Sequence, residues 1–69
     1  MEPHEIKVLI EYDDLNNKII KLASFVNVPN PVFDRLIAHD QCLLRRQLSI
    51  MEDYRDILMD RIKRIIKNA

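Results

Sequence analysis

Two prolines, Pro29 and Pro31, divide this chain of 69 residues into two long segments. Each proline lacks a backbone amide donor and restricts the residue before it, so neither segment continues as a helix through this point. Glycine is absent, and the segments on both sides follow a helical period. The chain is therefore expected to be all-α, with a long helix on either side of a short corner.

The first segment, about residues 3–25, has the apolar spacing of a coiled-coil helix. Its principal seam alternates steps of four and three and contains Val8, Tyr12, Leu15, Ile19, Leu22 and Val26. A second apolar strip lies away from this seam and contains Ile6, Leu9, Ile10 and Ile20. Because a single partner helix covers only one face, we interpret the second strip as a contact with another subunit.

Between the two prolines, Asn30 is expected to cap a short helix over about residues 31–37, which begins at Pro31. His39 or Asp40 then caps a long helix over about residues 40–67 that returns along the first. The result is an antiparallel helical hairpin with a short corner helix. A hairpin of this size cannot enclose a core alone, so the sequence predicts a homo-oligomeric helical bundle.

Three polar residues, Gln47, Tyr54 and Arg61, lie seven positions apart on the apolar face of the long helix, and we call them the polar row. Apolar residues flank the row on one side at Leu43, Ile50 and Ile57, and on the other at Leu44, Leu48, Met51, Leu58 and Ile62. A buried polar group without a partner costs about 1–3 kcal/mol. We therefore expect the row to be covered, either in a closed interface between subunits or at the bottom of a ligand pocket.

The composition excludes several classes of function for this single domain, residues 1–69. Eleven basic residues balance eleven acidic ones, so no global field attracts DNA, RNA or a membrane surface. Cys42 is the only cysteine and is expected to be a small buried hydrophobe, and neither a metal site nor a cofactor is expected. Without a leader or a spanning segment, the chain is expected to be soluble and cytoplasmic.

Catalysis is not expected. The acidic residues Asp53, Asp56 and Asp60 lie on helix flanks, and the pattern places no histidine or nucleophile near them. The sequence therefore favours a binding protein over an enzyme.

Two segments, Glu11–Val26 and Leu43–Ile62, resemble a family of small bacteriophage proteins named after crAss-like phages. The matching positions in the second segment are Leu43, Leu44, Gln47, Leu48, Met51, Tyr54, Ile57, Leu58, Arg61 and Ile62, which include the polar row. The helix-corner-helix plan is also similar to that of phage-encoded sponge proteins, which counter host defences such as CBASS by sequestering cyclic nucleotides as homo-oligomers. The chain lacks the tryptophan and glycine that the better-known sponges carry near the second helix.

The resemblance implies an anti-defence protein in the cytoplasm of an infected bacterial host. The candidate ligand-binding residues are Tyr12, Lys18, Lys21, Gln47, Tyr54, Arg55 and Arg61. Tyrosine rings stack on nucleobases, and lysine or arginine holds phosphates. The expected ligand is a cyclic nucleotide or a cyclic ADP-ribose-type molecule bound between subunits and withheld without catalysis. The alternative is a ligand-free oligomerisation or protein-interaction module, in which both tyrosines are ordinary seam residues and Gln47 sets the register.

Overall fold

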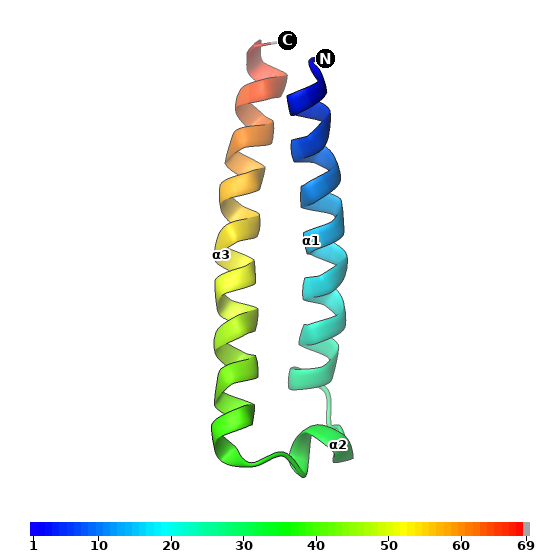
Figure 1. Cartoon of the computed structure of the whole chain (residues 1–69), viewed down its shortest axis with the longest axis vertical. Coiled ribbons are helices and arrows are strands. Elements are labelled where there is room, and N and C mark those ends of the chain that lie inside the picture. The colour runs from blue at the N-terminus through cyan, green and yellow to red at the C-terminus, as the bar shows by residue number, and fades with distance from the viewer. Residues whose placement is uncertain (69) are drawn as a thin grey trace.

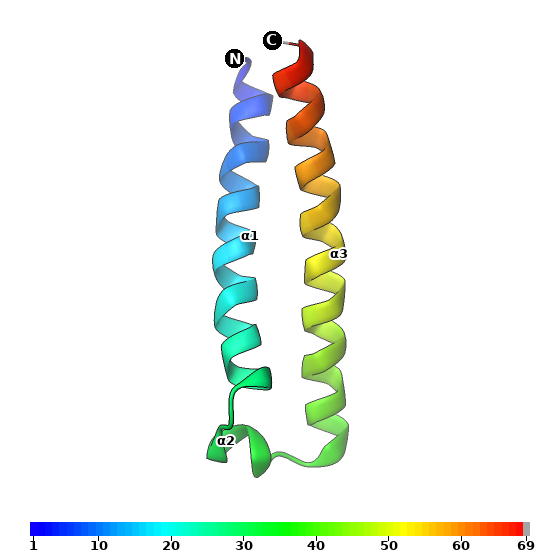
Figure 2. The ribbon, with the colours of Figure 1, turned by 180° about the vertical axis from the view of Figure 1, so that it is seen from behind.

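The computed structural model describes residues 1–68 as two long antiparallel helices joined by a short one (Figure 1). Helix α1 spans Pro3–Asn27, α2 spans Pro31–Asp34 and α3 spans Ala38–Asn68. No strand occurs within the described residues, so the predicted all-α hairpin is confirmed. The molecule is a rod of 48 × 16 × 15 Å, and the view from behind shows α2 at the end opposite the two termini (Figure 2).

The helix boundaries differ from the predicted ones mainly at the corner. Helix α2 ends at Asp34, three residues earlier than expected, because the chain turns sharply after it. Helix α3 begins at Ala38, so His39 and Asp40 lie in its first turn and do not cap it. The predicted cap of α2 is confirmed, since the side-chain oxygen of Asn30 accepts the first free amides of that helix, at 2.9 and 3.4 Å.

The corner is held by the buried ring of Phe33. This ring packs edge-on against Phe25 of α1, with 5.5 Å between the ring centroids. On the α3 side, the Arg45 guanidinium lies 5.1 Å from the Phe33 ring centroid, and the Gln41 side-chain amide donates to the Phe33 carbonyl at 2.9 Å. Phe33 therefore contacts both long helices and is the main attachment of the short helix.

The core is a single seam between α1 and α3. The buried side chains are Val8, Ile19, Val26, Phe33, Leu48, Leu58 and Ile62. Tyr12 and Leu15 pack against the cluster of Val8, Leu58 and Ile62, so the predicted seam of α1 does face α3. Leu9, which was expected on a separate strip, also packs against this cluster.

Much of the apolar surface stays uncovered in the single chain. On α1, Ile6, Ile10 and Ile20 are exposed, and on α3 Ile50 and Ile57 are exposed. A hairpin has only one internal interface, and that interface is already filled by the core seam. Among residues 1–68, no helix has the length and apolar character needed to cross a bilayer.

Candidate functional site

The polar row lies on the surface of the single hairpin. Gln47, Tyr54 and Arg61 are all exposed in the single chain, so the expectation that another subunit or a ligand covers the row stays a prediction. The reason for this exposure is the rotation of α3 about its own axis. The strip of α3 that faces α1 contains the buried Leu48, Leu58 and Ile62, and the row runs along the edge of that strip. Within one chain, solvent therefore reaches all three residues, and only another molecule can cover them.

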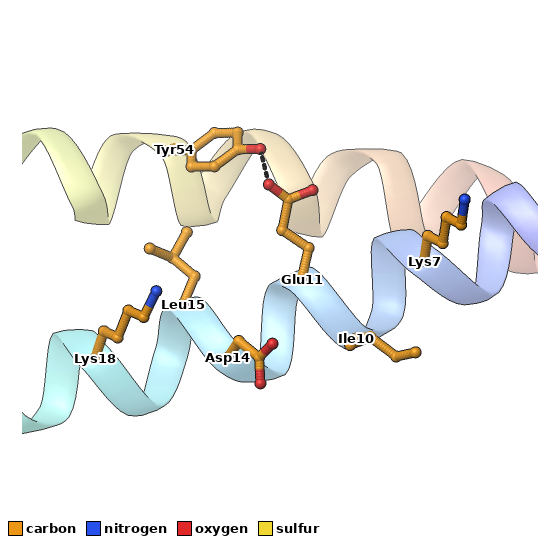
Figure 3. A pocket seen from close by; sticks show the side chains of 7 residues that line it. All are labelled: Lys7, Ile10, Glu11, Asp14, Leu15, Lys18 and Tyr54. Atoms are coloured by element: carbon orange, nitrogen blue, oxygen red, sulfur yellow. Dashed lines mark hydrogen bonds between the residues drawn. The ribbon is translucent and has the colours of Figure 1, made fainter.

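A groove beside the middle of the row contains Tyr54, and we call it the Tyr54 groove. It is lined by Lys7, Ile10, Glu11, Asp14, Leu15, Lys18 and Tyr54, so six of its seven residues come from α1. Figure 3 shows the Tyr54 ring beside Leu15, with Lys7 and Lys18 toward the two ends of the groove. An exposed aromatic ring between two cationic side chains suits a ligand with a planar ring and negative charge.

The hydroxyl group of Tyr54 already has a partner inside the hairpin. It donates a hydrogen bond to a carboxylate oxygen of Glu11, drawn as a dashed line in Figure 3. This bond raises the pKa of Tyr54 above its ordinary value of 10.0, with further contributions from desolvation and the Glu11 charge, against a lowering by Arg61. The phenol is therefore held neutral with its ring fixed in place.

The formal charge of the Tyr54 groove is balanced. Lys7 and Lys18 contribute two positive charges, and Glu11 and Asp14 contribute two negative ones. The two carboxylates disfavour a multiply charged anion bound in the groove alone. The groove is thus better suited to a nucleobase or another planar ring than to several phosphates.

A second hollow lies farther along the row, near the ends of the chain, and we call it the Arg61 hollow. It is lined by His4, Glu5, Val8, Arg61, Arg64 and Ile65. Two guanidinium groups outweigh one carboxylate there, and histidine adds charge when protonated. Arg61 follows Tyr54 by two helical turns, about 10 Å along α3. An exposed aromatic ring is therefore followed by two guanidinium groups along one edge of the hairpin.

The other predicted ligand residues are spread over different parts of the molecule. Gln47 lines a hollow with Leu43, Arg46, Ile50 and Met51, and its amide approaches the Met51 sulfur at 3.8 Å. Lys21 is exposed on α1. The structure thus brings Lys18 and Tyr54 into one groove and leaves Gln47 and Arg61 farther along the same row.

Two predicted residues belong to the interior seam. Tyr12 is half-buried against the core, so its ring is already in contact with α3. Arg55 is half-buried, and its Nη1 donates to the Asn16 side-chain oxygen at 3.2 Å. Since Arg55 follows Tyr54 by one residue, its side chain is rotated by about 100° and lies on the other edge of the hairpin.

Several lining residues were not predicted, namely Lys7, Glu11, Asp14 and Arg64. The register of the two antiparallel helices would have identified Glu11 as the partner of Tyr54. Val8 and Leu58 meet in the core, so one turn further along α1, position 11 lies opposite position 54 of α3. Cys42 was also misjudged, since it is exposed. It lies two residues before Leu44, a half-buried position, and so faces away from α1.

Comparison with known proteins gives one match. No curated protein and no solved structure matches the chain. A family model described as Sequestin matches residues 2–64. This range includes both long helices as far as Arg64, the whole Tyr54 groove, and the Arg61 hollow except Ile65. The match covers far more than half of the sequence. This chain therefore belongs to the Sequestin family.

Proposed function

We propose that this chain is a phage accessory protein that binds a nucleotide-derived immune signal of the infected host and withholds it from its effector. The pockets lie between subunits of a homo-oligomer, and no catalysis takes place. The family name, Sequestin, is in keeping with sequestration of a partner. The observation that carries the proposal is the edge formed by the polar row, where an exposed ring and two guanidinium groups follow one another.

In this proposal the base and the phosphates occupy different parts of the edge. The base stacks on the Tyr54 ring, which the Glu11 carboxylate holds in place. A phosphate lies in the Arg61 hollow, where the net charge is positive. The separation of about 10 Å between Tyr54 and Arg61 along the helix is of the order that a nucleotide spans between its base and a distal phosphate.

A thermal-shift screen tests the proposal with cyclic dinucleotides, cyclic trinucleotides and cyclic ADP-ribose isomers. A ligand at a hundredfold excess over its dissociation constant should stabilise the folded protein by about 2.7 kcal/mol. If no compound of these classes raises the melting temperature at millimolar concentration, nucleotide sequestration is wrong.

Variants at Tyr54 and Arg61 then locate the ligand. Tyr54→Phe should retain most of the affinity because it keeps the ring, whereas Tyr54→Leu should lose about 1–3 kcal/mol of stacking. Arg61→Gln should weaken binding of phosphate-bearing ligands. Lys67→Gln is the matched control, because Lys67 is exposed on the same helix and lines neither the Tyr54 groove nor the Arg61 hollow.

The second candidate function is a ligand-free helical module that binds a host or phage protein. The balanced charge of the Tyr54 groove and the exposed apolar side chains of α3 favour it. In that case Tyr54→Leu or Arg61→Leu should preserve or raise the stability of the assembled protein, since the row only sets register. Loss of ligand binding by an assembly that stays intact would favour sequestration instead.

A further inference from the structure

Helix α3 carries two coiled-coil seams, of which the hairpin uses one. The inner seam contains the buried Leu48, Leu58 and Ile62 and faces α1. An outer seam runs from Asp40 to Arg64 in alternating steps of three and four residues. Its six central members are Leu43, Gln47, Ile50, Tyr54, Ile57 and Arg61, all of them exposed. The apolar members Leu43, Ile50 and Ile57 occupy one of the two core positions of each heptad, and polar residues occupy the other. Such a solvent-facing strip can pack against another helix.

The angle between the two seams suits a helical bundle. Each outer position precedes an inner position by one residue, as Ile57 precedes Leu58, so the two seams lie about 100° apart around the helix. Neighbouring helices at the corner of a four-helix bundle subtend nearly this angle. The apolar members of the outer seam are 44%, 63% and 57% exposed at Leu43, Ile50 and Ile57, so their surface is available for burial.

We propose that the outer seam packs against the same seam of a second copy of this chain, with the two α3 helices antiparallel. Charge complementarity selects this partner and this direction. Antiparallel pairing about a two-fold axis near position 52 brings together Asp40 with Arg64, Leu43 with Arg61, Gln47 with Ile57, and Ile50 with Tyr54. Each end of the seam then joins an aspartate to an arginine.

Parallel pairing gives the opposite result. It places Arg61 against Arg61, Arg64 against Arg64 and Asp40 against Asp40, and like charges in contact repel. The flanking positions agree with the antiparallel direction, because Arg46 of one copy comes beside Asp60 of the other. Some contacts are unfavourable in this arrangement. Asp53 approaches its own symmetry mate near the axis, and Gln47 and Arg61 face the partner's Ile57 and the partner's Leu43, which offer them no polar group.

The pairing also borders the candidate site without depending on a ligand. On this side of the hairpin, helix α1 presents the charged residues Lys7, Glu11, Asp14 and Lys18. It therefore lacks an apolar strip against which a second copy could pack there. The second copy therefore contacts α3 and not α1, so the side of the Tyr54 groove formed by α1 stays open beside the interface, while Arg64 engages the partner's Asp40. The pairing rests on the homo-oligomer of the proposed function. A chain that binds no nucleotide but still assembles overturns the proposed function alone, whereas a chain that stays monomeric overturns both proposals.

Sedimentation equilibrium tests whether the seam holds two copies together. The full chain should assemble, and Ile50→Asp should lower its mass to that of one chain while circular dichroism retains the helical signal. The matched control is Ile66→Asp, since Ile66 is a similarly exposed isoleucine of the same helix and lies outside the outer seam. A full chain that sediments as a monomer, or an Ile50→Asp variant that assembles like the full chain, overturns the proposal.

The direction of pairing is tested by cross-linking and by a charge exchange. The native Cys42 is exposed, and in the antiparallel dimer the two copies of it lie about 30 Å apart, so a short bis-maleimide should not join them. A Cys42→Ser, Asp53→Cys variant should be joined efficiently, because position 53 lies near the axis. Cross-linking through Cys42 at an efficiency equal to that of position 53 overturns the antiparallel direction.

The charge exchange uses the ends of the seam. Arg64→Asp should weaken association at least tenfold, and adding Asp40→Arg should restore it, because the exchanged pair again has opposite charges. A double variant that associates no better than Arg64→Asp alone contradicts the antiparallel pairing.

Discussion

The hydroxyl group of Tyr54 on α3 donates a hydrogen bond to the carboxylate of Glu11 on α1, a residue 43 positions earlier in the chain. The bond joins the two helices at the edge of the hairpin, outside the apolar seam. The bond occupies the hydroxyl group of Tyr54, whereas the ring of Tyr54 stays exposed in the Tyr54 groove. A ligand therefore meets the face of this ring.

The titration of Tyr54 should follow from this bond. Glu11→Gln removes the carboxylate that raises the pKa of Tyr54, so the phenol should ionise at lower pH in that variant. A Tyr12→Phe background leaves Tyr54 as the only tyrosine, and ultraviolet absorbance of the phenolate follows its titration. Identical titration curves with glutamate and glutamine at position 11 would contradict the assigned cause.

The same pKa shift predicts a loss of stability at alkaline pH. The folded state favours the neutral phenol, so this contribution is fully present below the unfolded pKa of 10.0 and is lost as the pH rises through the raised folded pKa. Urea denaturation at a series of pH values above neutrality measures the effect. Tyr54→Phe should lack this component of the pH dependence while keeping the ring.

Arg55 and Asn16 should be coupled energetically. Their side chains are hydrogen-bonded at 3.2 Å across the seam, in a partly buried setting where such a bond contributes about 0.5–1.5 kcal/mol. A double-mutant cycle with Asn16→Ala and Arg55→Ala should yield a coupling of that order. Repeating the cycle with the exposed Asn17 in place of Asn16 supplies the control, and its coupling should be close to zero.

Neighbouring isoleucines on α1 should differ sharply in their contribution to stability. Ile19 is 3% exposed and Ile20 is 58% exposed. Ile19→Ala should therefore lower the free energy of unfolding by about 2–5 kcal/mol, and Ile20→Ala should change it by no more than about 0.5 kcal/mol. Equal losses, measured by urea denaturation at one protein concentration, would mean that the seam of α1 has been assigned to the wrong face.

The cap of α2 should also contribute measurably. Asn30→Ala leaves the amides of Val32 and Phe33 without their acceptor and should cost about 1 kcal/mol. Asn17→Ala is a suitable comparison, because Asn17 is exposed within α1 and alanine is the better helix former there. A stability unchanged by Asn30→Ala would show that the corner is held by Phe33 alone.

The fold was largely predictable because its determinants are local. The steps of four and three from Val8 to Val26 identified the buried face of α1, and Asn30 before Pro31 identified a helix start. The ends of α2 and α3 were less predictable, since the turn between them depends on the Gln41 contact with Phe33, which joins residues eight positions apart.

The candidate site was predictable only in part. Sequence spacing placed Tyr54 and Arg61 on one line, but it did not show which flank of that line α1 would cover. Apolar residues occur on both flanks, so the exposure of the row followed only from the packing of Leu48 and Leu58 against α1. Glu11 was missed for the same reason, because a pairing across the hairpin requires the register between the helices.

The hairpin leaves both ends of the described chain at one end of the rod, where Glu2 and Asn68 line the same hollow. Any segment fused to either terminus therefore emerges beside the other terminus, some distance from the Phe33 corner. A surface anchor or a fluorescent label attached there leaves the middle of α3 unobstructed. Labels on two copies paired antiparallel would lie at opposite ends of the assembly, which makes energy transfer between them a measure of that arrangement.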